Sequence, residues 1–591
     1  MSANATSPPS EGTGTLNGST HSVNAAVVTS PVDEKVQDEE KEIVAEEEAA
    51  ADFPRGIKLF LLMLALDLAV FLVALDNTII GTAIPRITDE FHSLEDVAWY
   101  GSSYLLATAA TQLLYGKLYT FLRVKWVFLS AIAIFEIGSA ICGAAPNSNA
   151  LIIGRAIAGL GSAGIFSGAL IIIAHAVPLS KRPIYTGLIG AMYVRSRECW
   201  CVEKLGNTIK LTLLEPRHCL GVFSPIVSRG AGASNSSIAE HINVWVQNLP
   251  IGAVTLVIIL FFFKMPASAD HAPSQLTFWE RFNQFDIPGT MVFIPAIVSL
   301  LLALQWGGTK YDWNSARIIA LFVVFGVLII AFVGIQIWKQ ENATVPPRIF
   351  TQRSIWSGSL FVLCLGGSFF IIVFYLPIWF QAVKGTSAYR SGISIIPSIL
   401  SLVVASIIAG SLVTVTGYYT PWVILSSVLM SVGAGLLYML KTDTPSSRWI
   451  GYQIVYGFGI GFGMQQPVIA AQTVLDLKDV PVGTSILMFL QTLGGALFIA
   501  AGTNIFTTKL VEGVTQNVPG ISPLVVVTAG ATSLKDLIDP ALLPAVLEAY
   551  NAALMKSFQV AIALAAASII GAAFMEWKSI KGKDISMGAA A

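Results

Sequence analysis

The chain has 591 residues and a formal net charge of −1; 54% of its residues are hydrophobic and 12% are charged. Soluble globular domains carry about 25% charged residues, so this composition excludes that class, and the near-zero charge gives no basis for binding nucleic acid. Five cysteines and six histidines show no ligand spacing, so neither a metal nor another cofactor is predicted. The composition predicts an all-α polytopic membrane protein.

Residues 1–54 differ from the rest of the chain. Serine, threonine, glycine and asparagine come first, and an acidic run follows at 38–48. Such a segment cannot bury enough apolar surface to fold, so a disordered acidic cytosolic tail is expected. No basic segment with a short apolar core precedes Ile57, which predicts that there is no cleaved signal peptide and that the first apolar run is a permanent span.

The remaining chain contains about fourteen apolar runs, and a helix needs about 20 apolar residues to cross a bilayer. Most connections are short, but residues 507–555 include four prolines and are expected to form a long, exposed, partly helical external loop. The fifth run is interrupted by charges. The expected spans are 57–81, 97–120, 126–145, 150–178, 183–205, 246–264, 286–306, 316–338, 355–379, 391–416, 420–440, 449–473, 482–506 and 556–577.

Lysine and arginine in short loops predict the orientation, because these residues concentrate on the cytosolic side of a membrane. They follow the second, fourth, eighth and fourteenth runs, whereas the loop at 88–92 is acidic. The basic loops share one side only if the number of spans is even and both termini are cytosolic. The chain is therefore expected to end in a cytosolic tail at 578–591.

Three acidic residues lie at membrane depth. Asp76 lies in the string Leu75–Ile80, with Pro85 just beyond, and a carboxylate there marks a substrate or proton path by default. The alternative is a carboxylate that reaches water near the helix end. Asp67 lies nine residues earlier, on the opposite face at about 100° per residue. Glu136 is expected to pack between helices rather than to take part in transport.

The fourth run combines Arg155 with small residues four apart, Gly159 with Ala163 and Gly164 with Gly168. Small residues at this spacing let helices approach closely in lipid, so the glycines alone indicate packing. Arg155 lies about one turn into the span. Its side chain either extends to the interface or pairs with a buried acid or carbonyl.

Several short motifs follow one another in a fixed order. They are Leu75–Ile80 with Pro85; Trp99, Tyr104, Leu105 and Leu106; Gly116–Leu118; Arg155, Gly159 and Gly161; Asn248–Gly252; and Gln491 with Gly494–Gly495. Together they resemble the major facilitator superfamily, specifically its fourteen-span drug:proton antiporters and their fungal toxin-efflux branch. The resemblance covers about residues 55–577. No Gly-x-x-x-x-Gly-Lys-Ser/Thr loop for ATP is present, which favours a secondary transporter.

The resemblance implies two six-helix halves, at 55–264 and 346–577, joined by a linker with two extra spans at 265–345. It implies export of small amphipathic toxins, drugs or secondary metabolites in exchange for protons, with Asp76 and Arg155 in proton coupling. A multi-pass protein of the plasma membrane, or of the vacuolar membrane, is expected. The alternatives are a siderophore or nutrient carrier of the same fold, and a non-functional product that lacks an intact fifth span.

Polar side chains in the spans are candidates for the substrate cavity, and hydrogen bonds between helices are the alternative explanation. The candidates are Asn77, Thr78, Gln112, Gln465, Gln466 and Gln491. Gating or packing is assigned to Gly116, Lys117, Arg123, Lys125, Gly159, Gly161 and Pro85. The loop Tyr119–Lys125 lacks the family's acidic residue, so the charge pair that holds the inner gate of relatives is not expected in its usual form.

Residues 194–244 depart from the family. Where Gly-Pro-x-x-Gly-Gly is expected, residues 194–204 read Val-Arg-Ser-Arg-Glu-Cys-Trp-Cys-Val-Glu-Lys, and each charge would cost roughly 2.5–3.5 kcal/mol at mid-span. In a shifted reading frame, the codons of Leu220–Ser234 can encode Gly-Gly-Val-Phe-Thr-Asp-Arg-Val-Ser-Trp-Arg-Trp-Cys-Phe, which resembles the family. We therefore infer a frame error from an unspliced intron or a wrong splice site; the alternative is a real insertion.

Overall fold

A computed structural model describes residues 56–91, 97–190, 238–263, 285–308, 310–518 and 538–581, together with Pro54, Ser522 and Val526. Side chains between 77 and 98 lie outside this description. The expected tail at 1–54 and most of the tail at 578–591 also lie outside it, so both remain predictions.

Long helices account for most of the described residues, which contain no strand. A helix satisfies its backbone hydrogen bonds internally, which is what lipid demands of a spanning segment. The N-terminal group consists of α2 (Ile57–Phe91), α3 (Val97–Phe121), α4 (Val124–Gly143), α5 (Ser148–Ala176), a helical run at 182–190, and α9 (Ile238–Phe262).

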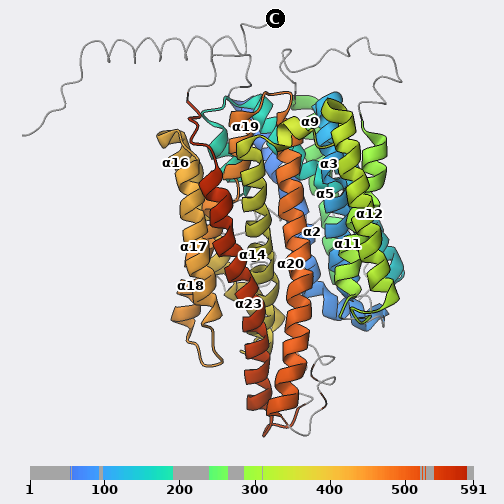
Figure 1. The fold of residues 1–591 in the computed structure, drawn as a ribbon, viewed down its shortest axis with the longest axis vertical. Helices are drawn as coiled ribbons and strands as arrows, with labels where there is room; N and C mark the ends of the chain where they lie inside the picture. Colours follow the sequence, from blue (N-terminus) through green and yellow to red (C-terminus); the bar gives the residue numbers. More distant parts are fainter. Residues whose placement is uncertain are drawn as a thin grey trace, which may run out of the picture. The chain divides into compact units, whose positions relative to one another are not determined.

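Two further helices precede the C-terminal group, and Figure 1 shows the long helices of both groups standing side by side. The connecting elements are α11 (Ile287–Trp306), α12 (Ala316–Lys339), η2 (Gln340–Asn342) and α13 (Pro347–Phe350). The C-terminal group consists of α14 (Arg353–Ala382), α15 (Ala388–Ser394), α16 (Ile396–Thr416), α17 (Thr420–Tyr438), α18 (Ser446–Gly463), α19 (Gln466–Val474), α20 (Val480–Asn517) and α23 (Leu543–Phe574).

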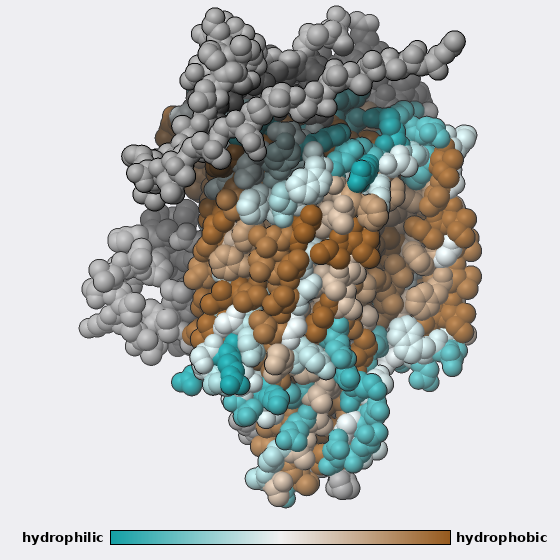
Figure 2. Space-filling view, turned by 60° about the vertical axis from the view of Figure 1, so that its left-hand side comes forward, coloured by the Kyte–Doolittle hydropathy of each residue, from teal (hydrophilic) through white to brown (hydrophobic). Residues whose placement is uncertain are grey.

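Among the described residues, ten helices are long and apolar enough to cross a membrane. The more polar α3 and α18 are not among the ten, and the described side chains of α9 form a shorter apolar helix at Asn248–Phe261. The count of fourteen spans therefore stays a prediction. The face drawn in Figure 2 carries an apolar band between polar regions above and below, as expected of helices surrounded by lipid.

Glycines let the helices of each group meet backbone to backbone. In the N-terminal group, a methyl group on Gly161 of α5 would overlap with the backbone nitrogen of Phe135 on α4. In the C-terminal group, Gly366 of α14 lies against the carbonyl of Gln491 on α20. Because lipid provides no hydrophobic force between helices, such close packing is a main source of their association.

A buried aspartate fixes the two connecting helices. Asp286 is the N-cap of α11, and its carboxylate accepts a hydrogen bond from the backbone nitrogen of Gly289 (3.1 Å). It also accepts one from Gln336 Nε2 on α12 (3.0 Å), and two from Thr344, from its nitrogen and its hydroxyl (2.8 Å each). One side chain therefore joins α11, α12 and the segment that leads to α13.

The segment 507–555, expected to form a partly helical external loop, is helical at both ends, because α20 continues to Asn517 and α23 already begins at Leu543. The 38 residues of α20 span about 57 Å, well beyond the about 30 Å of a bilayer core. Figure 1 shows α20 and α23 reaching beyond the neighbouring helices. Buried Val514 and Val546, and the ring contact of Phe506 with Tyr550 (5.1 Å), hold the extensions together.

Two other boundaries differ from the expectation. The first helix does not end near residue 81 but continues through Pro85 to Phe91. The last residues of the segment 194–244 are helical, since α9 begins at Ile238. Residues 194–237 lie outside the described residues, and the inferred frame error stays a prediction.

Candidate functional site

Arg155 of α5 forms a salt bridge with Asp76 of α2. Both side chains are buried, with 1% and 0% of their surfaces exposed. Of the two possibilities for Arg155, pairing with a buried acid is therefore confirmed. Truncating one partner of a buried ion pair typically costs about 3–5 kcal/mol, because the remaining charge is left uncompensated.

Backbone and aromatic groups hold the guanidinium of Arg155 in place. Its Nε donates to the carbonyl of Tyr100 (2.9 Å), and its Nη1 donates to the carbonyl of Asp76 (3.1 Å). The ring of Tyr104 lies 4.5 Å from the guanidinium carbon, a cation–π contact. The Tyr100 hydroxyl donates in turn to Ser148 at the start of α5 (2.9 Å). Three helices, α2, α3 and α5, therefore converge on one charge pair.

The candidate cavity residues fall into different environments. Asn77 and Thr78 lie on α2, but their side chains are outside the described residues, as is that of Pro85. Gln112 donates to the carbonyl of Ala163 on α5 (3.3 Å), so it takes part in a hydrogen bond between helices.

The remaining glutamines all belong to the C-terminal group. Gln491 is buried on α20. Gln465 and Gln466 are buried at the junction of α18 and α19, and the Oε1 atom of each has no hydrogen-bond donor. These two therefore keep unused capacity to bind a polar group. Their assignment to a cavity remains a prediction.

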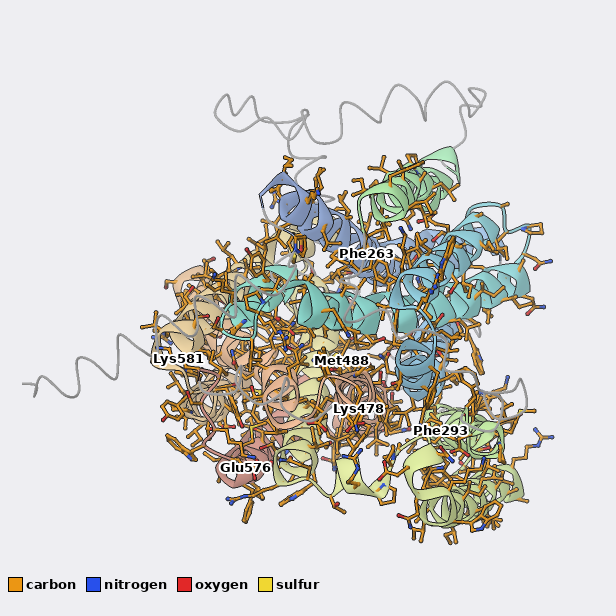
Figure 3. All side chains as sticks on the ribbon, turned by 90° about the horizontal axis from the view of Figure 1, so that it is seen from above. Phe263, Phe293, Lys478, Met488, Glu576 and Lys581 are labelled. Carbon is orange, nitrogen blue, oxygen red and sulfur yellow. The ribbon has the colours of Figure 1, made fainter. Side chains whose placement is uncertain are left out.

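The N-terminal and C-terminal groups touch near one end of the helices. Gly116 of α3 lies against Ser485 of α20, where a Cβ atom would come within 2.9 Å of the serine. Leu170 of α5 packs with Val468 and Met488, and Figure 3 shows Met488 near the centre of the view along the helices. Gln472 of α19 donates to the carbonyl of Leu170 (3.5 Å). These contacts join α3 and α5 to α19 and α20.

A cluster of charges, here called the charged end, lies beside these contacts; it consists of Lys117, Glu341, Arg348 and Asp479. Arg348 donates to both oxygens of Glu341 (3.0 and 3.2 Å) and to Asp479 (2.9 Å). Lys117 is buried at the end of α3, and its Nζ lies 3.5 Å from the carbonyl of Glu341. The hydrogen bonds to Glu341 and Asp479 raise the pKa of Arg348 further above its usual value, so it stays cationic.

The remaining gating and packing candidates have structural contacts. Lys125 Nζ donates to the carbonyls of Leu260 and Phe263 (2.8 Å each), so it caps the end of α9. Arg123 is exposed between α3 and α4. Gly159 lies against the carbonyl of Tyr104, next to Arg155. Lys125 and Gly159 therefore serve packing in this structure.

Some members of the site were not predicted from the sequence. Tyr100, Glu341 and Asp479 come from segments far apart in the chain, and only the fold brings them to Arg155 or Lys117. Only Asp479 had a signal in the sequence that could have identified it, because it lies just before the apolar run at 482–506. Within the described parts of the chain, no group of three metal-ligating side chains is present.

Comparison with known proteins gives three findings. The model of the Major Facilitator Superfamily matches residues 66–194. The MFS-type efflux pump MFS1 of Trichophyton rubrum is 55% identical over 547 residues, which is 93% of this chain and 96% of the relative. The efflux pump aflT of Aspergillus parasiticus is 47% identical over 540 residues, 91% of this chain and 99% of the relative.

A solved structure supports the fold. The bacterial homologue of the human lysosomal transporter Spinster, inward-facing and unoccupied, matches with a TM-score of 0.54 at 16% identity, over 88% of this chain and 98% of that one. This likeness concerns the fold alone, whereas the sequence relatives cover nearly the whole chain and are named as transporters rather than enzymes. The chain is a multi-pass membrane protein that belongs to the Major Facilitator Superfamily.

Proposed function

We propose that the protein exports small amphipathic compounds in exchange for protons. The buried pair of Asp76 and Arg155 carries this proposal, because an ion pair at membrane depth is costly and marks a proton or substrate path. The names of the relatives as efflux pumps favour export over uptake.

In the proposed mechanism, Asp76 receives a proton from the outer side and releases it inward as substrate leaves. The proton neutralises the carboxylate and thereby weakens its attraction to Arg155, which remains held by the carbonyl of Tyr100. Because Asp76 and Arg155 lie on α2 and α5, the loss of this attraction changes how strongly the two helices are held together. A proton can thus bias the equilibrium between two arrangements of the helices.

We place the charged end on the cytosolic side, because the neighbouring loop Tyr119–Lys125 is basic and both termini are expected on that side. The contacts of Gly116 with Ser485 and of Leu170 with Gln472 would then close the inner side. Arg348, Glu341 and Asp479 would supply the charge interaction that the loop Tyr119–Lys125 cannot supply. Opening toward the cytosol would require these contacts to separate, as in alternating access.

The Asp76→Asn variant tests the proton coupling. Asparagine has nearly the same shape but takes up no proton, so export driven by a pH gradient should be abolished. Arg155 loses its ionic partner, but the carbonyls of Tyr100 and of residue 76 still accept its hydrogen bonds, so we expect enough folded protein for the measurement. The measurement is uptake of an amphipathic dye, rhodamine 6G, into inverted vesicles with an acidic lumen, which reports export in the cell. The amount of correctly inserted protein is measured in parallel. Retained gradient-driven export in the variant would contradict the assignment of Asp76.

Arg155 needs a separate control, because Arg155→Ala leaves the charge of Asp76 unpaired and can destabilise the protein. Arg155→Lys retains a cation but loses the planar hydrogen-bonding geometry. Both variants should lose the pH dependence of export, and Lys should retain more folded protein than Ala. An unchanged pH dependence in both would mean that Arg155 is structural.

Uptake of an iron chelate, instead of export of the dye, would favour the alternative that the protein is a siderophore carrier.

A further inference from the structure

A second buried carboxyl group lies between α4 and α9. Glu136 of α4 has 9% of its surface exposed, and neither of its carboxylate oxygens has a hydrogen-bond donor. Its Oε1 lies over Gly252 of α9, so that a methyl group at residue 252 would overlap with it. Gly252 therefore provides the space in which the Glu136 carboxyl lies.

The surroundings of Glu136 are polar but supply too few donors. One turn along α4, the Ser139 hydroxyl accepts a hydrogen bond from Asn248 Nδ2 (3.3 Å), and Asn248 belongs to the same motif as Gly252. The Oδ1 atom of Asn248 also lacks a donor. Three buried oxygen atoms at the contact between α4 and α9 can therefore accept a hydrogen bond, but none of them receives one from the described residues.

An ionised, unpaired carboxylate in such a place is disfavoured by several kcal/mol, whereas a protonated one is uncharged and can donate. The described side chains of α9 include no cation, and Arg155 of α5 is already bound to Asp76. Tyr104 of α3 lies against Arg155. Among the described side chains of α2, α4, α5 and α9, the other buried titratable groups are Asp67 and Asp76 on α2, Cys142 on α4 and Arg155 on α5.

We propose that Glu136 is a second proton-binding group, which holds a proton in this conformation and releases it during the transport cycle. The step is balanced: Glu136 gives its proton to water and becomes charged, and it takes up a proton again when the protein returns to this conformation. This inference rests on the proposed proton antiport and adds a residue to its path. It also gives Glu136 a role beyond the helix packing that the sequence suggested.

Infrared spectroscopy of the purified full-length protein without substrate tests the protonation directly. Labelling with ¹³C-glutamate should shift a protonated-carboxyl band of the wild-type protein, and Glu136→Gln should remove that band. Glu136 is the only buried glutamate among the described residues, and the exposed Glu512→Gln is the matched control, which should keep the band. A spectrum without a glutamate-dependent band, or a band that Glu136→Gln leaves intact, would overturn the inference.

Transport separates this inference from the proposed function. In inverted vesicles that take up rhodamine 6G, Glu136→Gln should reduce the number of protons moved per dye molecule and flatten the pH profile, whereas Glu136→Asp should restore part of it. If Asp76→Asn abolishes coupling but Glu136→Gln leaves the pH profile unchanged, Glu136 is structural and the antiport proposal stands. If neither variant alters coupling, the proposed antiport itself fails.

Discussion

At the scale of single residues, glycine decides where helices can meet. Gly161 and Gly159 of α5 allow the backbones of α4 and α3 to approach, and Gly159 does so beside Arg155. By contrast, Gly334 on α12 has no atom within 4 Å of the position of a Cβ atom. The same residue type therefore has a packing role at one position and none at another, and a substitution can distinguish them.

We expect Gly161→Ala to destabilise the protein by about 1–3 kcal/mol, because the added methyl group meets backbone atoms that cannot move independently. The measurement is the thermal unfolding midpoint of the detergent-solubilised protein. Gly334→Ala is the matched control and should leave the midpoint unchanged. Equal midpoints for both variants would show that the contact between α5 and α4 is looser than the structure indicates.

At the scale of elements, the charged end links the segment between α12 and α14 to α3 and α20. Arg348 and Glu341 are half-exposed or more, so each pair contributes at most about 1 kcal/mol. Such small energies suit a contact that has to open and close in every cycle. The large apolar contacts of Leu170 with Val468 and Met488 lie beside it.

Of the two pairs of Arg348, only the one with Asp479 joins the segment between α12 and α14 to α20. Loss of this pair in Arg348→Gln should raise the accessibility of the inner contact by up to about fivefold. The measurement is the labelling rate of Ser485→Cys by a membrane-impermeant thiol reagent, in a background that lacks the natural cysteines. Lys509→Gln removes an exposed ion pair with Glu512 near the other end of α20 and serves as the control. A labelling rate that responds equally to both substitutions would argue against a gate at the charged end.

At the scale of the whole molecule, the region matched by the family model ends where the sequence departs from the expected motif. The family model matches residues 66–194, and each charge that follows Val194 would cost roughly 2.5–3.5 kcal/mol at mid-span. The motif Asn248–Gly252, with which the family resemblance resumes, lies on α9 and forms the contact with Glu136. The fold on both sides of the segment thus agrees with the family.

We expect the spliced transcript to encode Gly-x-Leu-x-Gly-Gly and Trp-Arg-Trp between the codons for Tyr185 and Pro250. The measurement is sequencing of the transcript across this region. The physical reason is that several uncompensated charges at mid-span would prevent insertion of the fifth helix. The control is the neighbouring exon sequence, which should agree with the printed protein. A transcript that encodes Val194–Val244 as printed would favour a protein without an intact fifth span and without transport.

The sequence by itself determined the helical class and the family, and it singled out Asp76 and Arg155 as candidates, because long apolar runs and a charge at membrane depth are local features. The tertiary structure decided which groups meet. It paired Arg155 with Asp76, turned Gln112 to the carbonyl of Ala163, and placed Glu136 over Gly252. Partners 51 to 116 residues apart are joined by helix packing, which periodicity within one helix cannot predict.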